Sequence, residues 1–135
     1  MKKHYNLLIL LLLIPFLGFS NDDAYITKQK TIKKTYIVNS NAGIDVNNKY
    51  GNITVTTWDE DKIDIDVLIT ISGDDEDWVD KRLASITVDF EGNKNLYSAK
   101  TIFDKVNNSS RRSSMEINYT IKIPKKGHIK IDNQY

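Results

Sequence analysis

Two runs of acidic residues are the first candidates for chemistry in this chain. Asp59-Glu60-Asp61 and Asp74-Asp75-Glu76-Asp77 gather carboxylates, and Asp64 and Asp66 share one face of an alternating segment. Hard cations such as Ca²⁺ need several oxygen ligands from a loop of defined spacing, such as D-x-[DN]-x-[DN]-G. Neither run has that spacing, so a turn and a helix N-terminus explain them better. We therefore predict no metal site and no cofactor.

Side chains for nucleophilic catalysis are sparse. His128 is the only histidine after residue 20, and the chain contains no cysteine. A serine nucleophile needs an adjacent base, and His128 follows Gly127 in a predicted turn. A secreted hydrolase that uses paired carboxylates is a less favoured alternative, because 18 acidic residues supply many pairs. We predict that the protein is not an enzyme.

Aromatic residues are the better candidates for function. Tyr50, Trp58, Tyr97, Tyr119 and Tyr135 lie in predicted strands or at predicted turns. Exposed rings on a flat sheet can stack on sugars or contact protein partners. These five residues form the candidate binding surface, and the partner would be a glycan or a protein of the envelope or cell surface. The alternative for Tyr50 and Tyr135 is that they pack as wedges at equivalent corners of a repeat.

The elements that must position these residues are mostly β-strands. Branched apolar residues alternate with polar ones over many segments, which is typical of strands with one buried face and one wet face. We therefore predict a mainly β fold with an antiparallel or solenoid-like sheet. The predicted strands are Thr35–Val38, Ile44–Val46, Ile53–Trp58, Ile63–Ser72, Ile86–Phe90, Tyr97–Phe103, Ile117–Ile123 and Ile129–Ile131.

One short α-helix is predicted at about residues 75–85. Acidic residues precede Trp78, and Lys81 and Arg82 come near the end, so both termini complement the helix dipole. Trp78, Val79 and Leu83 are expected to face the sheet. Residues 104–114 are polar and predict a solvated loop.

The first twenty residues have the pattern of a secretory signal peptide. Lys2 and Lys3 precede an apolar run from Leu7 to Phe19, and cleavage is expected after Ser20. A membrane-spanning helix, the alternative, needs about 20 apolar residues. Export to the periplasm, cell surface or medium would leave a flexible leader at 21–31, one domain at 32–135, and no integral membrane span. The remaining 17 basic and 18 acidic residues give no general attraction to nucleic acid.

A repeated segment gives the chain its most unusual feature. Ile44-Asp-Val-Asn-Asn-Lys-Tyr50 returns as Ile129-Lys-Ile-Asp-Asn-Gln-Tyr135. Repeats of about 20–30 residues mark the rungs of a solenoid, whereas these copies lie 85 positions apart. We interpret them as one corner used twice, around an inserted module. The second copy stops where the first makes its turn, so we expect a domain truncated at its C-terminus.

Three segments resemble a known family. Lys34–Val38, Ile44–Trp58 with its Asn-Lys-Tyr-Gly-Asn-Ile sequence and following Asp59, and Glu116–Lys125 with the second repeat copy are similar to the start of bacterial exported adhesin-like proteins. The resemblance covers about residues 32–135. It implies a non-enzymatic surface protein whose later part is a right-handed β-solenoid, and it transfers no site residues. The alternative is a structural or assembly cap for a longer solenoid, without a ligand of its own.

Overall fold

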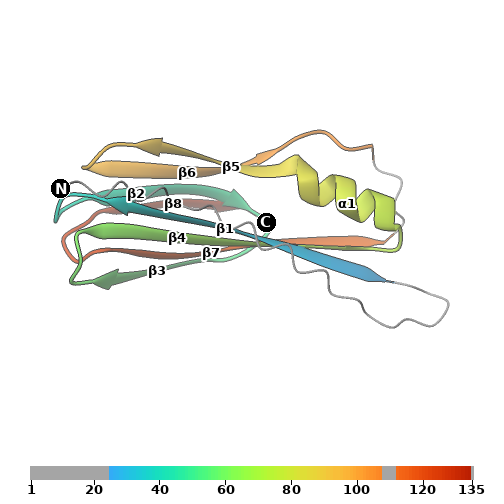
Figure 1. Ribbon diagram of the computed structural model, residues 1–135, viewed down its shortest axis with the longest axis horizontal. Coiled ribbons are helices and arrows are strands. Elements are labelled where there is room, and N and C mark those ends of the chain that lie inside the picture. Colours follow the sequence, from blue (N-terminus) through green and yellow to red (C-terminus); the bar gives the residue numbers. More distant parts are fainter. Residues whose placement is uncertain (1–24, 108–111, 135) are drawn as a thin grey trace, which may run out of the picture.

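Two four-stranded sheets and one helix make up the part of the chain that the structure describes (Figure 1). The computed structural model describes residues 25–107 and 112–134. In spatial order, the long sheet contains β1 (Ile26–Ile37), β4 (Lys62–Gly73), β7 (Ser113–Pro124) and β3 (Ile53–Trp58). The short sheet contains β5 (Ile86–Gly92), β6 (Leu96–Phe103), β2 (Gly43–Lys49) and β8 (Ile129–Gln134). The prediction of a mainly β fold with one short helix is confirmed, while the described residues contain no solenoid and no closed sheet.

The hydrophobic core lies between the two sheets and beneath the helix α1 (Glu76–Ser85). The inward residues of β4 run from Ile63 to Ile71 at every second position, and all five are fully buried. Burying one such side chain contributes about 1.5–3 kcal/mol. Figure 1 shows why both halves of these long strands are covered: the short sheet lies over one half and α1 over the other.

The helix begins and ends as its sequence predicts. Asp75 is the N-cap, and its side chain accepts a hydrogen bond from the Trp78 backbone N–H at 3.3 Å. Trp78, Val79 and Leu83 are buried. The predicted helix at residues 75–85 and its sheet-facing side are therefore confirmed.

Strand pairing is mixed in both sheets. In the long sheet β1, β4 and β7 are antiparallel, but β3 runs parallel to β7. In the short sheet β5 and β6 are antiparallel, whereas β2 runs parallel to both β6 and β8. The predicted antiparallel pairing therefore holds for only some of the strand pairs. The reason is that β2 and β3 lie in different sheets, so the Tyr50–Asn52 turn is a corner between sheets and not a hairpin.

The two copies of the repeated segment lie side by side. β2 and β8 pair in parallel, and Ile44 is opposite Ile129, Val46 opposite Ile131, and so on to Lys49 opposite Gln134. Each residue from Ile44 to Lys49 is therefore matched with its own equivalent in the second copy. This stacking of equivalent strands is what the interpretation of a corner used twice requires.

Two sequence predictions are wrong at their boundaries. The expected leader at 21–31 overlaps β1, which begins at Ile26. The inward row of β1 includes Lys28, Lys30 and Lys34, which interrupt the apolar alternation and hid the strand. The expected loop at 104–114 ends earlier, because β7 begins at Ser113. The signal segment at 1–20, with its cleavage after Ser20, lies outside the described residues.

Candidate functional site

The four described aromatic residues of the predicted binding surface do not gather on one face. Tyr97 points inward from β6 and stacks on Tyr36, with ring centroids 3.9 Å apart. Trp58, at the end of β3, donates its indole N–H to the Lys62 carbonyl at 2.8 Å. Tyr50 lies at the corner between β2 and β3, and Tyr135 falls outside the described residues. No shared surface results from these positions.

Tyr119 belongs to the core, so its prediction as a binding residue is wrong. Its side chain is 1% exposed, and its hydroxyl lies 2.6 Å from Thr101 Oγ1. Thr101 donates to Asn48 Oδ1 at 2.9 Å, so Tyr119 must supply the proton of the other bond. Asn48 in turn donates to the Ile117 carbonyl at 2.9 Å. Burial raises the pKa of Tyr119 to about 12.

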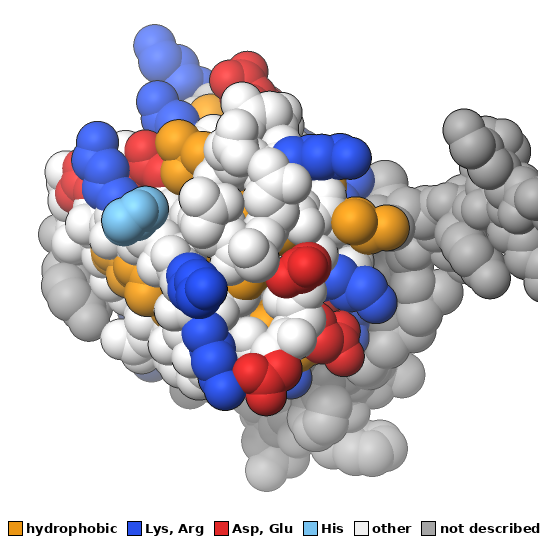
Figure 2. Space-filling view, turned by 90° about the vertical axis from the view of Figure 1, so that its left-hand side faces the viewer, with side chains coloured by type: hydrophobic (Ala, Val, Ile, Leu, Met, Phe, Trp, Pro, Cys, Tyr) orange, Lys and Arg blue, Asp and Glu red, His pale blue; other side chains and the backbone are white. Residues whose placement is uncertain are grey.

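Several of the acidic residues singled out in the sequence pair with lysines or lie at the start of α1. Asp59 forms an ion pair with Lys125 at 2.6 Å, and Asp66 lies 3.9 Å from Lys33. The second run caps and begins α1. Figure 2 looks onto one end of the molecule, where basic and acidic side chains are interspersed and no single-sign patch forms. Among the described residues, no three His, Asp or Glu side chains are grouped to hold a metal ion.

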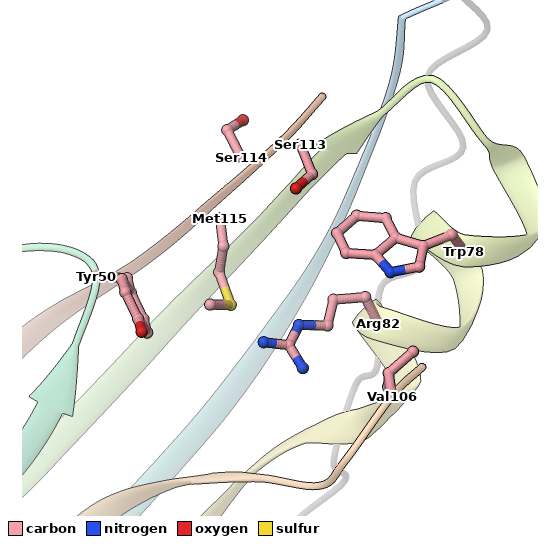
Figure 3. A pocket seen from close by; sticks show the side chains of 7 residues that line it. All are labelled: Tyr50, Trp78, Arg82, Val106, Ser113, Ser114 and Met115. Carbon is pink, nitrogen blue, oxygen red and sulfur yellow. The ribbon is translucent and has the colours of Figure 1, made fainter. Parts of the chain in front are cut away.

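A cleft beside α1 has polar groups that converge on it, and we call it the helix cleft (Figure 3). It has a volume of about 360 Å³ and opens to solvent. Its walls come from α1, the β2–β3 corner, the segment after β6 and the start of β7. The lining residues are Tyr50, Trp78, Arg82, Val106, Ser113, Ser114 and Met115.

Most residues of the helix cleft could not be predicted as a site from the sequence. Trp78 and Arg82 are four residues apart on α1 and therefore share one side of the helix. Figure 3 shows the Arg82 guanidinium reaching into the cleft below Met115, toward Tyr50. The spacing of Trp78 and Arg82 was readable from the sequence, but nothing local indicated that the distant β2–β3 corner would face them.

Tyr50 is held in an unusual conformation at the edge of this cleft. Its φ angle is +65°, a left-handed conformation that only small or polar residues adopt readily. Its ring is 44% exposed and meets Phe103 edge-on, with centroids 5.9 Å apart. The Tyr50 backbone N–H donates to the Gln134 carbonyl, and its carbonyl accepts from the Ile117 N–H. Tyr50 thus lies at the corner between the two sheets and also forms one wall of the cleft.

A second feature is the edge formed by β3 and β8, which we call the open edge. Each of these strands is the last in its sheet on this side. Ile129 and Ile131 of β8 are 49% and 44% exposed, although their partners Ile44 and Val46 are fully buried. The apolar row of the core therefore continues into solvent at the open edge.

Beside the open edge, the corner between the sheets contains the same kind of hydrogen bond twice. Asn48 Nδ2 donates to the Ile117 carbonyl at 2.9 Å, and Asn133 Nδ2 donates to the Gly51 carbonyl at 2.8 Å. Asn133 is the residue opposite Asn48 in the strand pairing. Extending the β3–β7 register backward places Gly51 beside Ile117. In two successive layers, an equivalent asparagine side chain thus donates a hydrogen bond to the backbone of the corner.

Comparison with protein-family models, with curated proteins and with solved structures finds no match for this chain. The resemblance to adhesin-like proteins stays a prediction. Within the ranges 25–107 and 112–134, no helix is long and apolar enough to span a bilayer.

Proposed function

We propose that this chain is the capping module of an exported, non-enzymatic, adhesin-like protein, and that its open edge receives the strands of a right-handed β-solenoid. The observation that carries the proposal is the in-register parallel pairing of the two repeat copies. The export signal pattern and the family resemblance support the same reading. The capping role is the alternative that the sequence left open, and the scattered aromatic residues make it the stronger one.

The open edge supplies the driving force for stacking. Ile129 and Ile131 each leave nearly half of the side chain in water, while the equivalent residues one strand away are fully covered. Burying the exposed halves contributes about 2 kcal/mol in total. The Oδ1 atom of Asn133 is buried without a hydrogen-bond partner among the described residues, and a donor from an added strand would satisfy this acceptor.

The opposite edge of the long sheet is protected. The inward row of β1 carries Lys28, Lys30 and Lys34. Lys28 lies 2.5 Å from Asp80 of α1, and the Lys34 ammonium lies 5.7 Å from the Phe90 ring centroid. Inward-pointing charges on an edge strand discourage further pairing. Growth of the long sheet is therefore favoured at β3 and not at β1, as a one-ended cap requires.

The occupant of the open edge is a further unit of the same repeat, supplied by the same polypeptide. β2 continues through the Tyr50–Asn52 corner into β3, which lies beside β7 in parallel. β8 carries the same sequence pattern in the next layer. A strand that continues from β8 through an equivalent corner would therefore lie parallel to β3 at its free edge.

The experiment is to append the sequence of Gly51–Trp58 directly after Tyr135 and to compare the extended protein with the original. We expect hydrogen–deuterium exchange of the β3 amides to slow, because their free edge becomes paired. We also expect the free energy of unfolding to rise, with an apolar contribution of about 2 kcal/mol. Urea titration and exchange mass spectrometry measure the two effects.

The matched control carries the same extension with lysine in place of both branched residues that correspond to Ile53 and Val55. It should leave exchange and stability unchanged, because lysine cannot fill the apolar row. Equal behaviour of the two extensions would count against the proposal. Dimerisation of the original protein through β3 and β8 would show that a second copy, and not the same chain, covers this edge.

Direct binding of a glycan or surface protein is the second candidate function. The helix cleft is the observation that favours it, because it combines aromatic walls with a cationic side chain. The cleft lies beside α1 and requires no covering of the open edge.

A further inference from the structure

The helix cleft contains two nitrogen donors without partners. Trp78 is only 7% exposed, and its buried Nε1 atom forms no hydrogen bond among the described residues. The Arg82 guanidinium is half-buried and forms no ion pair or side-chain hydrogen bond in the described part of the chain. Leaving a buried donor unpaired is costly. Only the Trp78 donor is buried, and the half-exposed Arg82 guanidinium borders the same cavity, so we infer that an acceptor binds there.

The two donors belong to one recognition site. In Figure 3 the indole nitrogen of Trp78 is on the ring edge that faces Arg82, and both side chains point into the cleft. The planar guanidinium pairs best with an acceptor that has two coplanar oxygens, such as a carboxylate. None of the described residues that line the helix cleft is acidic, so an incoming carboxylate meets no repulsion from them.

The rest of the lining fits the body of a sugar ring. The exposed Tyr50 ring and the Met115 side chain form an apolar wall, and a sugar can lay its C–H face on such a surface. The Ser113 hydroxyl is exposed and can exchange hydrogen bonds with ring hydroxyls, while Ser114 also contacts Tyr25 at 3.4 Å. The volume of about 360 Å³ lies within the range of small-ligand sites.

We propose that the helix cleft binds a carboxylate-bearing sugar unit of the uronic acid type. Arg82 pairs with the carboxylate, Trp78 donates its indole N–H to the ligand, and the Tyr50 ring stacks on the sugar face. A phosphate group fits less well, because Arg82 is the single cation among the lining residues that the structure describes. This site goes beyond the capping role and does not depend on it.

The test is a titration of the ¹⁵N-labelled protein with glucuronate, followed through the two indole N–H signals. The Trp78 signal should shift to saturation by about 10 mM ligand, as weak monosaccharide binding requires. The Trp58 signal should stay in place, because its N–H is already bonded to the Lys62 carbonyl. Glucose and acetate are the comparison ligands, and each should bind at least about tenfold more weakly.

Arg82→Gln is the decisive variant and should weaken glucuronate binding at least about tenfold, because a charged hydrogen-bond partner is lost. Lys81→Gln is its matched control, since it removes the same charge from the neighbouring exposed position of α1 and should change the affinity less than about twofold. Circular dichroism verifies that both variants fold. An unshifted Trp78 signal, equal binding of glucose or acetate, or equal losses in the two variants would each overturn the proposal.

Discussion

The buried hydroxyl of Tyr119 makes a prediction that separates a core residue from a binding residue. Tyr119→Phe removes only the hydroxyl and keeps the ring that fills the core. In the wild type this hydroxyl donates to Thr101, which donates in turn to Asn48. The variant leaves the second bond intact. We expect it to lower the free energy of unfolding by about 1 kcal/mol at neutral pH.

The pH dependence gives a sharper result, because the Tyr119 hydroxyl stabilises the folded protein at neutral pH and destabilises it at alkaline pH. Burial raises the pKa of Tyr119 in the folded protein to about 12, whereas a tyrosine in the unfolded chain titrates near about 10. Between these values the unfolded chain binds fewer protons, so the free energy of unfolding falls as the pH rises. The loss is complete above the folded value and amounts to about 3 kcal/mol over about two pH units.

The two effects together predict that the stability curves converge. At about pH 7 the wild type is more stable than Tyr119→Phe, and by about pH 11 the loss of about 1.4 kcal/mol has removed this advantage. Urea unfolding of both proteins at several pH values measures the difference, in which the titration of other groups cancels. A difference that stayed constant from neutral to alkaline pH would refute the assigned burial of the hydroxyl.

Two further substitutions test the corner and the helix. Gly51→Ala should destabilise the protein by more than about 3 kcal/mol, because an added Cβ would lie 1.8 Å from the Ile117 carbonyl oxygen; urea unfolding with near-wild-type stability would show that the corner can relax. Asp75→Ala should cost about 1 kcal/mol, because it removes the N-cap acceptor of α1. A thermal melt that did not fall by a few degrees would mean that water or a neighbour replaces this acceptor.

Most of the individual elements could be predicted from local patterns. The alternation from Ile63 to Ser72 fixed both the strand and its buried face, since successive side chains of a strand point to opposite sides. The same reasoning places Tyr119 among Ile117, Ile121 and Ile123, so its burial was readable although it was assigned to a surface. β1 was hidden because inward lysines replace apolar residues where an edge strand meets solvent.

The candidate site was harder to predict from the sequence. Trp78 and Arg82 share one helix side in any reading of residues 75–85. The helix cleft exists only because Tyr50 and Met115 are brought to that side by the β2–β3 corner and by β7. These residues are separated from the helix by long stretches of chain, and no local pattern encodes their approach.

The sequence by itself determined which segments are strands, which faces are apolar, where the helix begins and ends, and that one segment occurs twice. Only the tertiary structure decided that the strands divide into two mixed sheets, that the two repeat copies pair in parallel and in register, and that a cleft forms beside α1. The physical reason is that side-chain alternation fixes the face of a strand, whereas its partner is chosen by contacts across the whole core. Ile44 and Ile129 have the same pattern, yet one is buried and the other half-exposed, because only one has a further layer beside it.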